Sequence, residues 1–356
     1  MREYDIAVIG LGPAGATFAR MLDERFKVIA IDKKDASGKA GFQKPCGGLL
    51  ASDAQKALSQ FNLTLPKKLL MDPQIFAVKT IDLKARIKRY YQRFYMNMDR
   101  HAFDLWLMSL IKQNVTVEDN SRCCKIERED RRFKITYNKG NQNEENVIFA
   151  RFVVGADGAN SIVRNTFFKH RKIRKYLSIQ QWFVDKNARP LYSCFFDRDI
   201  TDCYAWSISK DGNFIVGGAF PVKTATARFE MLKEKLREHG YVFGEPVKTE
   251  ACMVMRPFGL LEHCPGSGGA FLLGEAAGLI SPSSLEGISY AFESGAILAE
   301  VFNLGKGDLN RRYNRKLFKT RIKLMVKNVK SFFMYFPLSR WFIMKIGLQA
   351  IKVKEE

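Results

Sequence analysis

The sequence predicts an α/β protein in which a Rossmann-like domain is joined to a β-rich second domain and a helical C-terminal tail. The chain opens with an apolar run, a glycine-rich turn, a stretch with helical spacing and a second apolar run, which is the order of a βαβ unit. From about residue 173 to residue 219, short aromatic runs are separated by turn sequences such as "KDG", which is typical of an antiparallel sheet. From residue 306 onward the chain is strongly basic, and apolar and aromatic residues recur among the cations as in amphipathic helices.

The composition limits the class of protein. With 356 residues, 46% hydrophobic and 27% charged, the chain is a folded globular protein that is too long for one ordinary core. Seven cysteines, no CxxC pair and four histidines argue against a disulfide scaffold and a metal site, so we predict no metal. We see no signal peptide and no uncharged apolar run of spanning length, and we expect a cytoplasmic protein. The formal charge of +21 predicts an anionic partner.

The first turn carries the pattern G-x-G-x-x-G between a predicted strand and a predicted helix, and Asp32 ends the next strand. We expect Gly10 to form the turn, Gly12 to let a pyrophosphate approach, and Gly15 to let the helix pack closely on the strand. The helix N-terminus would present free N–H groups to the phosphates, and Asp32 would accept hydrogen bonds from a ribose. The alternative is a glycine-rich turn that binds nothing.

Two later stretches, "VVGADGANSIVR" (residues 153–164) and "FLLGEAAGLISPSSLEGISYA" (residues 271–291), resemble signatures of FAD-dependent enzymes built like para-hydroxybenzoate hydroxylase. The resemblance implies an FAD-binding domain of that fold. It places Asp157 and Gly158 near the pyrophosphate and ribose, and Gly274 and Glu275 at the ribityl chain. The family usually has an aspartate where this chain has Glu275.

The same resemblance places two further groups at the flavin. The helix after Gly287 would point its N-terminus at the N1–C2=O edge, where its dipole stabilises the negative charge of reduced flavin. Arg100, in "MDRHAFDLWL", matches an arginine near the flavin and its phosphates. The predicted cofactor-binding residues, including those of the loop described next, are Gly10, Gly12, Pro13, Ala14, Gly15, Asp32, Lys33, Cys46, Gly47, Gly48, Arg100, Asp157, Gly158, Gly274, Glu275, Gly287 and Ile288.

The stretch "KPCGGLL" (residues 44–50) resembles the geranylgeranyl reductase branch of this superfamily. The stretch "DCYAWSISKDG" (residues 202–212) is similar to a Tyr-x-Trp-x-Phe-Pro stretch of those reductases, with Ile208 and Ser209 in place of Phe-Pro. Together with "GEAAG" and "SSLEGISYA", these stretches are most similar to the bacterial CbrA-type oxidoreductases of that branch. The resemblance implies that Gly47 and Gly48 lie against the isoalloxazine ring and that Cys46 faces the substrate side.

Two interpretations of Cys46 stay open. A thiol beside a flavin could donate the proton that complements hydride delivery from N5 to an alkene. Alternatively, Cys46 is a small apolar residue that shapes a pocket. The other six cysteines fit structural packing, and His101 and His170 fit surface or capping positions.

The aromatic residues of the second domain also allow two interpretations. Trp182, Phe195, Tyr204 and Trp206 could line an apolar substrate tunnel, or they could form the packed face of a sheet; Tyr204 and Trp206 share one face by their spacing. A second G-x-G-x-x-G after a strand is absent from the sequence, so the electrons would come from transiently bound NAD(P)H or from a redox protein. The substrate residues that we commit to are Trp182, Tyr204 and Trp206.

The basic tail is predicted to contain amphipathic helices that bind an anionic membrane surface, here the inner face of the membrane. The alternative is a helical cap that packs on the catalytic domains and exposes a basic face. Charge alone would also suit nucleic acid, but no recognition motif accompanies it, so we predict no nucleic-acid partner.

These expectations define three parts of the chain. The FAD-binding domain is predicted to comprise residues 1–72, 100–170 and 265–305, the substrate domain residues 73–99 and 171–264, and the tail residues 306–356. The expected reaction is reduction of carbon–carbon double bonds in a prenyl-type or other apolar lipid. The alternatives are a flavin monooxygenase or epoxidase, and an electron-transfer flavoprotein that reduces a quinone.

Overall fold

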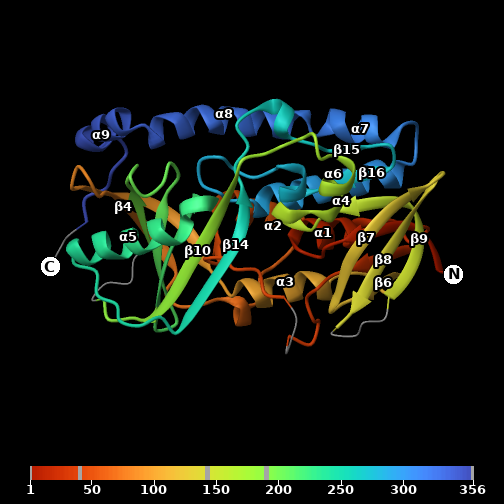
Figure 1. Cartoon of the computed structure of the whole chain (residues 1–356), viewed down its shortest axis with the longest axis horizontal. Coiled ribbons are helices and arrows are strands. Elements are labelled where there is room, and N and C mark those ends of the chain that lie inside the picture. Colours follow the sequence, from red (N-terminus) through yellow and green to blue (C-terminus); the bar gives the residue numbers. More distant parts are fainter. Residues whose placement is uncertain (1, 39–41, 141–144, 188–191, 354–356) are drawn as a thin grey trace. The chain divides into compact units, whose positions relative to one another are not determined.

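The computed structural model describes residues 2–38, 42–140, 145–187 and 192–353 and divides the chain into two compact units (Figure 1). Unit 1 comprises residues 1–44, 101–174 and 255–326, and unit 2 comprises residues 45–100, 175–254 and 327–356. The helices and strands agree with the mixed α/β class predicted from the sequence. Within the described ranges we find no helix whose length and apolar character would let it cross a bilayer.

Unit 1 is built on a mostly parallel sheet with the order β15-β16-β9-β1-β2-β6, and β7 and β8 extend it beside β9. Its strands are β1 (Arg2–Ile9), β2 (Val28–Ile31), β6 (Val115–Glu118), β7 (Ser121–Glu129), β8 (Arg132–Lys139), β9 (Glu145–Gly155), β15 (Gly266–Ser267) and β16 (Ala270–Leu272). The four residues of β2 are all buried, as are the last four residues of β1, because parallel strands are covered on both faces. The predicted opening βαβ unit is therefore confirmed.

Helices cover this sheet and connect its strands. They are α1 (Pro13–Met21), α3 (Arg100–Ser109), α4 (Ile162–Phe167), α6 (Ile288–Leu304) and α7 (Leu309–Lys316), with 3₁₀ turns η2 (Gly158–Asn160), η4 (Leu260–Glu262) and η5 (Gly274–Ala277). Helices α1 and α6 pack closely because residue 295 is glycine: a Cβ there would lie 2.5 Å from the carbonyl oxygen of Ala14. The close packing fixes the position of the glycine turn that begins α1.

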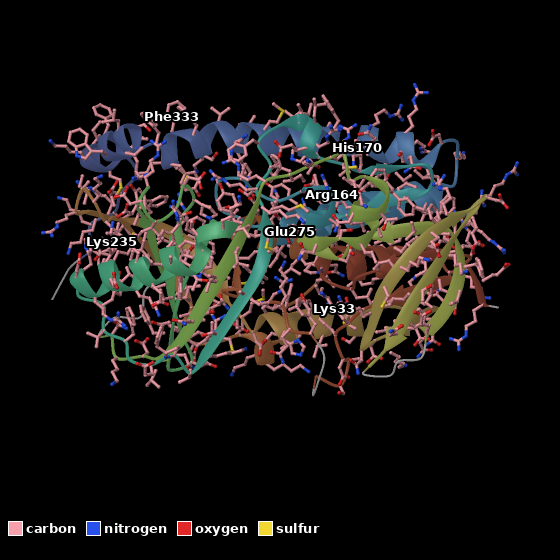
Figure 2. The ribbon with its side chains drawn as sticks, in the orientation of Figure 1. Lys33, Arg164, His170, Lys235, Glu275 and Phe333 are labelled. Atoms are coloured by element: carbon pink, nitrogen blue, oxygen red, sulfur yellow. The ribbon has the colours of Figure 1, made fainter. Side chains whose placement is uncertain are left out.

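Unit 2 is built on a second sheet with the order β14-β10-β13-β12-β11-β4-β5-β3. Its elements are β3 (Leu49–Leu50), α2 (Ser52–Gln60), η1 (Lys67–Leu69), β4 (Ile75–Asp82), β5 (Ile87–Asn97), β10 (Lys175–Val184), β11 (Tyr192–Phe196), β12 (Ala205–Lys210), β13 (Asn213–Pro221), η3 (Val222–Thr224), α5 (Ala225–Glu238), β14 (Lys248–Met255) and α9 (Pro337–Ile346). The sheet is antiparallel as predicted, except that β11 pairs with β4 in parallel. Lys235 holds α5 on the sheet through an ion pair with the buried Asp197 at 2.5 Å (Figure 2).

The predicted domains stay a prediction, and the two units divide the chain differently at residues 45–72, 171–174, 255–264 and in the tail. Residues 45–72 fall in unit 2 rather than in the FAD-binding domain, because β3 pairs with β5. Within the predicted tail, α7 is assigned to unit 1 and α9 to unit 2, and α8 (Phe318–Tyr335) contains the division at residue 326. The sequence showed that the tail is helical, but not where its contacts lie.

A buried cluster of polar residues joins the loops of unit 1. Arg164 is buried, and its guanidinium donates to the carbonyl oxygens of Ala276, Arg171 and Glu262 at 3.0, 2.7 and 3.1 Å (Figure 2). His263 is buried beside it, and neither ring nitrogen has a hydrogen-bond partner within the described residues. Burial lowers the pKa of His263 to about 4, and the positive charges of Arg321 and Arg164 add to the effect.

We predict that His263 makes unit 1 sensitive to acid. The unfolded imidazole takes up a proton near pH 6.5 and the folded one only near pH 4, so stability is lost as the pH falls between these values. The full loss corresponds to about 3 kcal/mol. The His263→Leu variant should lose less stability than the parent between pH 6.5 and pH 4 in urea unfolding measured at several pH values.

The exposed His170 provides the control, since His170→Leu should leave the pH dependence unchanged. The pKa of Asp157 is raised to about 6, so protonation of Asp157 stabilises the folded state as the pH falls through part of this range. Asp157 is present in every variant, so its effect cancels in the comparison. Equal pH dependence in the parent and His263→Leu would show that the folded imidazole titrates normally.

Candidate functional site

Two glycines of the first turn are required by close backbone contacts. Gly10 has φ +98°, and a Cβ there would lie 2.7 Å from the carbonyl oxygen of Ala156 and 2.9 Å from the Cα of Asp157. A Cβ at Gly15 would collide with the carbonyl oxygen of Gly10. The turn after β1 and the loop after β9 therefore lie in direct contact, as expected for strands paired in parallel register.

Gly12 differs from both of these glycines. It precedes Pro13 as the N-cap of α1, its φ is −71°, and no atom lies within 4 Å of the position that a Cβ would take. Gly12 itself has no side chain with which to cap the first turn of α1. Open space beside uncapped N–H groups is what a phosphate group requires at a helix N-terminus.

Asp32 is buried at the end of β2, but its carboxylate already has donors. It accepts hydrogen bonds from the backbone N–H of Leu11 and from that of Lys34, and the Lys34 ammonium lies 3.0 Å from both of its oxygens. These contacts occupy the lone pairs of both oxygens. The predicted ribose contact of Asp32 stays a prediction, and it would require one of these donors to move.

Lys33 is the neighbouring predicted cofactor residue (Figure 2). Its ammonium group lies over the ring of Phe42, 4.0 Å from the ring centre. Burial lowers the pKa of Lys33, while the carboxylates of Asp32 and Asp157 favour its charged form. Lys33 is therefore a cation at the carboxyl ends of β2 and β9, where a phosphate-containing ligand would find it.

Asp157 carries an acceptor atom that has no protein partner. Its Oδ2 accepts the N–H of Ile162 at 2.6 Å, whereas its Oδ1 is buried and has no hydrogen-bond partner within the described residues. Burial raises the pKa of Asp157 to about 6. An unpaired buried oxygen is costly, and a hydroxyl group of a bound ribose would satisfy it.

The third motif lies beside the first two within unit 1. Glu275 forms an ion pair with Lys44 at 3.0 Å and accepts the N–H of Met255 at 3.0 Å (Figure 2). A Cβ at Gly158 would lie 3.7 Å from Glu275 Oε2 and 3.9 Å from Lys44 Nζ. The longer arm of Glu275, compared with the family's usual aspartate, is thus used to reach Lys44.

Gly274 completes this convergence. Its φ is +50°, its N–H donates to Ser294 Oγ at 3.0 Å, and a Cβ there would lie 3.2 Å from the Cβ of Ala14. The turn 10–15, the loop 156–158 and the turn 274–275 therefore meet at one edge of the sheet of unit 1. Lys44 was not predicted, because only its distant partner Glu275 reveals its role.

The helix predicted to face the flavin is present. Gly287 is the N-cap of the 17-residue α6, Ile288 is its first residue, and no side chain caps its first turn. Its contact with the flavin N1–C2=O edge stays a prediction. The residues described in unit 1 fit a dinucleotide: open space at Gly12, a cation at Lys33, an unpaired acceptor at Asp157 and a second uncapped helix.

Unit 2 holds the loop with Cys46. The N–H of Gly48 donates to Cys46 Sγ at 3.4 Å. A Cβ at Gly47 would lie 2.6 Å from Ile208 Cδ1, and one at Gly48 (φ +69°) would collide with the Lys210 ammonium. Within this unit the two glycines make room for β12, and their predicted contact with the isoalloxazine ring stays a prediction.

Lys210 is a site residue that the sequence did not reveal. Its side chain is buried, and its ammonium donates to the carbonyl oxygens of Gly47 at 2.7 Å and Met98 at 2.8 Å. Burial lowers its pKa to about 8, and Cys46, Asp99 and Asp211 partly offset that effect. Lys210 therefore ties the Cys46 loop to β5 and β12.

The other predicted site residues lie as follows. Arg100 is the first residue of α3 and is half-buried. Trp182 donates to Glu250 at 2.8 Å, and the rings of Tyr204 and Trp206 lie 5.5 Å apart, as expected for residues on one face. Phe195 is buried in a core cluster, so it belongs to the packed face of the sheet. Trp182 and Trp206 are only partly buried, and they pack against a second cluster.

We predict that Lys210→Met loosens the Cys46 loop without unfolding the chain. The charged form of Lys210 is disfavoured by about 3 kcal/mol relative to water, which is comparable with the loss of its two hydrogen bonds. Net stability should therefore change by less than about 2 kcal/mol. Amide hydrogen exchange in residues 46–50 should become faster.

Lys233→Met is the matched control, because Lys233 is also buried in unit 2 and donates to Gln181 at 3.0 Å, away from the loop. It should leave the exchange of residues 46–50 unchanged. Unaltered exchange of these residues in Lys210→Met would mean that the loop is held by other contacts.

Comparisons with known proteins give the family. No protein-family model matches the chain. Protein CbrA of Escherichia coli K12 is 50% identical over 351 residues, covering 99% of this chain and 99% of that protein.

Solved structures share the fold at low identity. A geranylgeranyl bacteriochlorophyll reductase-like protein from Thermoplasma acidophilum superimposes with a TM-score of 0.76 at 19% identity, covering 93% of this chain and 88% of that one. PqsL, a probable FAD-dependent monooxygenase from Pseudomonas aeruginosa, gives a TM-score of 0.70 at 15% identity, covering 98% and 100%. The para-hydroxybenzoate hydroxylase-like fold predicted from the sequence is thus confirmed. Because the identity with CbrA is 50% along almost the whole length of both chains, this chain belongs to the CbrA family.

Proposed function

We propose that this chain is an FAD-dependent oxidoreductase that reduces carbon–carbon double bonds of a prenyl-type or other apolar lipid. The observation that carries the proposal is the meeting of three motifs in unit 1, at residues 10–15, 156–158 and 274–275, around uncapped helix ends and an unpaired acceptor. The lipid substrate is supported by the resemblance of "KPCGGLL" and by the reductase-like name of one structural neighbour.

The chain's own residues would divide the work between binding and proton supply. The N-terminus of α1 and Lys33 would bind the pyrophosphate, and Asp157 Oδ1 would accept a ribose hydroxyl. Bound and reduced flavin would supply a hydride to one alkene carbon. Cys46 Sγ would donate a proton to the other carbon, and solvent would reprotonate the thiolate.

The electrons come from NAD(P)H or from a redox protein, so that two hydrogens add across the double bond and the donor is oxidised. One alternative reaction is oxygenation or epoxidation, which is supported by the name of PqsL among the structural neighbours. The other is electron transfer to a quinone. Turnover with a geranylgeranyl lipid separates the three: anaerobic gain of two hydrogens indicates reduction, oxygen-dependent gain of one oxygen indicates oxygenation, and an unchanged lipid with reduced quinone indicates electron transfer.

We predict that Gly12→Val abolishes tight FAD binding while the chain still folds. The backbone at Gly12 is in an ordinary region and a Cβ there would meet no neighbour within 4 Å, so we expect the variant to fold. It would occupy the place of the pyrophosphate and weaken FAD binding by at least about a hundredfold. Flavin absorbance of the purified protein, followed by titration with FAD, measures the effect.

Gly244→Val is the matched control, because Gly244 also has no atom within 4 Å of its Cβ position and lies in unit 2. It should retain FAD. A colourless parent protein that takes up NAD instead of FAD would overturn the proposed cofactor.

We predict that Cys46→Ala retains FAD but lowers turnover of the lipid by roughly a hundredfold or more, because the proton donor is lost. Cys46→Ser should recover part of the rate. Reduction of the flavin by its electron donor should proceed at the parent rate, since the thiol acts only after reduction. Stopped-flow measurements of flavin reduction and reoxidation separate these two steps.

Cys252→Ala is the control for this experiment. The thiol of Cys252 lies 3.6 Å from the carbonyl oxygen of Pro45, next to the same loop, and has no proposed chemical role. Parent-like turnover of Cys46→Ala would leave Cys46 as a residue that only shapes the pocket.

A further inference from the structure

Eight large apolar side chains are exposed on the last helices of unit 2. They lie on the C-terminal part of α8 and on α9, and we call them the apolar ridge. Its members are 39% to 72% exposed, and Phe333 is labelled in Figure 2. They are Val329, Phe332, Phe333, Phe336, Leu338, Trp341, Phe342 and Ile346. Soluble proteins rarely expose large apolar patches, and such patches mark interaction surfaces.

The opposite side of these helices is fixed to the sheet by a polar anchor. Arg340 is buried and forms an ion pair with Asp82 at the end of β4, with Nε 2.8 Å from Oδ2. The ring of Tyr335 lies 5.8 Å from that of Phe196, and Met344 is buried. The usual arrangement of a surface helix, apolar inside and charged outside, is thus reversed for Arg340 and the ridge.

The ridge itself is ordered by its own contacts. The rings of Phe332 and Phe336 stack with their centres 5.8 Å apart and an angle of 8° between their planes. Such contacts hold an outward apolar surface ready for a partner without requiring it to rearrange. The remaining question is which partner covers it.

The positive charge around the apolar ridge indicates which kind of partner covers it. Residues 309–353 contain no aspartate or glutamate, and Lys330, Lys345 and Lys352 are exposed. The Lys345 ammonium lies 4.6 Å from the ring centre of Trp341, so a cation borders the ridge directly. A second copy of the chain would bring these like charges together, whereas an anionic lipid surface attracts them and accepts the apolar side chains between them.

We propose that the apolar ridge inserts into the interface of an anionic lipid bilayer, with the flanking lysines at the headgroups. The helices lie in the plane of the interface, and the Arg340–Asp82 ion pair keeps the ridge facing the lipid. This inference rests on unit 2 alone and does not depend on the proposed reaction. A lipid substrate would nevertheless be extracted where such a surface docks.

The experiment is flotation of the full-length protein with vesicles of phosphatidylcholine, with and without phosphatidylglycerol. The parent should float with the mixed vesicles, and a smaller fraction of it should float with vesicles of phosphatidylcholine alone. Binding should fall but persist at about 1 M salt, because a Debye length of about 3 Å screens the lysines but not the apolar contacts. Brominated lipids should quench tryptophan fluorescence in the parent and much less in Trp341→Phe.

The variant Phe332→Ser/Leu338→Ser/Phe342→Ser should bind the mixed vesicles at least about tenfold more weakly, because three inserted side chains are lost. The matched control is Val242→Ser/Val247→Ser/Leu261→Ser, which alters three residues of similar exposure elsewhere in the chain and should bind like the parent. Circular dichroism and bound flavin establish that each variant is folded.

The proposal would be overturned if the parent did not bind the mixed vesicles at low salt, or if both triple variants lost binding equally. It would also be overturned if the parent formed a dimer, the ridge variant did not, and neither protein bound vesicles. Arg340→Leu gives a second test that keeps the ridge chemically intact. Without the ion pair to Asp82 the ridge loses its fixed orientation, so vesicle binding should fall although every apolar side chain remains.

Discussion

The contact between the backbone at Gly10 and the loop after β9 is the constraint on which the candidate cofactor site depends. Because β1 and β9 pair in parallel register, their carboxyl ends bring residues 10 and 156–157 together, with no room for a Cβ at residue 10. The same contact aims α1 and positions Asp157 beside its N-terminus. Gly295 and Gly274 then allow α6 and the turn 274–275 to approach α1, since a Cβ would lie 2.5 Å from the carbonyl oxygen of Ala14 at Gly295 and 3.2 Å from the Cβ of Ala14 at Gly274. The site is thus built from backbone contacts, and side chains are added at its edge.

Among the buried polar groups of unit 1, one arginine and two unpartnered groups bear on the candidate site and on its stability. Arg164 uses its guanidinium to pair the carbonyl groups of three loops, which replaces the hydrogen bonds that irregular backbone would otherwise lose. Asp157 Oδ1 and the ring nitrogens of His263 have no hydrogen-bond partner among the residues that the structure describes. The first lies among the predicted cofactor motifs, where a ribose hydroxyl of the proposed cofactor would satisfy it. The second is tolerated because the imidazole stays neutral at ordinary pH.

The sequence was sufficient for the features that depend on local pattern. The opening βαβ unit, the conformational demands at Gly10 and Gly15, and the helical tail follow from residue types at short spacing, and the family resemblance added the fold. Contacts between residues that are distant in the sequence could not be predicted from it. Nothing near Lys44 indicates Glu275, and nothing near Lys210 indicates Gly47, since each pair is joined only by the packing of separate strands. The predicted ribose contact of Asp32 stays a prediction, and the structure adds that Lys34 and the N–H of Leu11 already bind its carboxylate.

The tail shows where periodicity alone gives an ambiguous answer. An amphipathic pattern indicates that two faces of a helix differ in polarity, but it does not indicate which face packs on the protein. A helical cap would turn its aromatic side chains inward and expose its cations, and a membrane-binding helix would do the reverse. The buried ion pair between Arg340 and Asp82 supports the proposed membrane-binding arrangement at α9, because a charged residue is buried only where a partner of opposite charge compensates it. Once Arg340 points inward at α9, the helical spacing places Leu338, Trp341 and Phe342 outward.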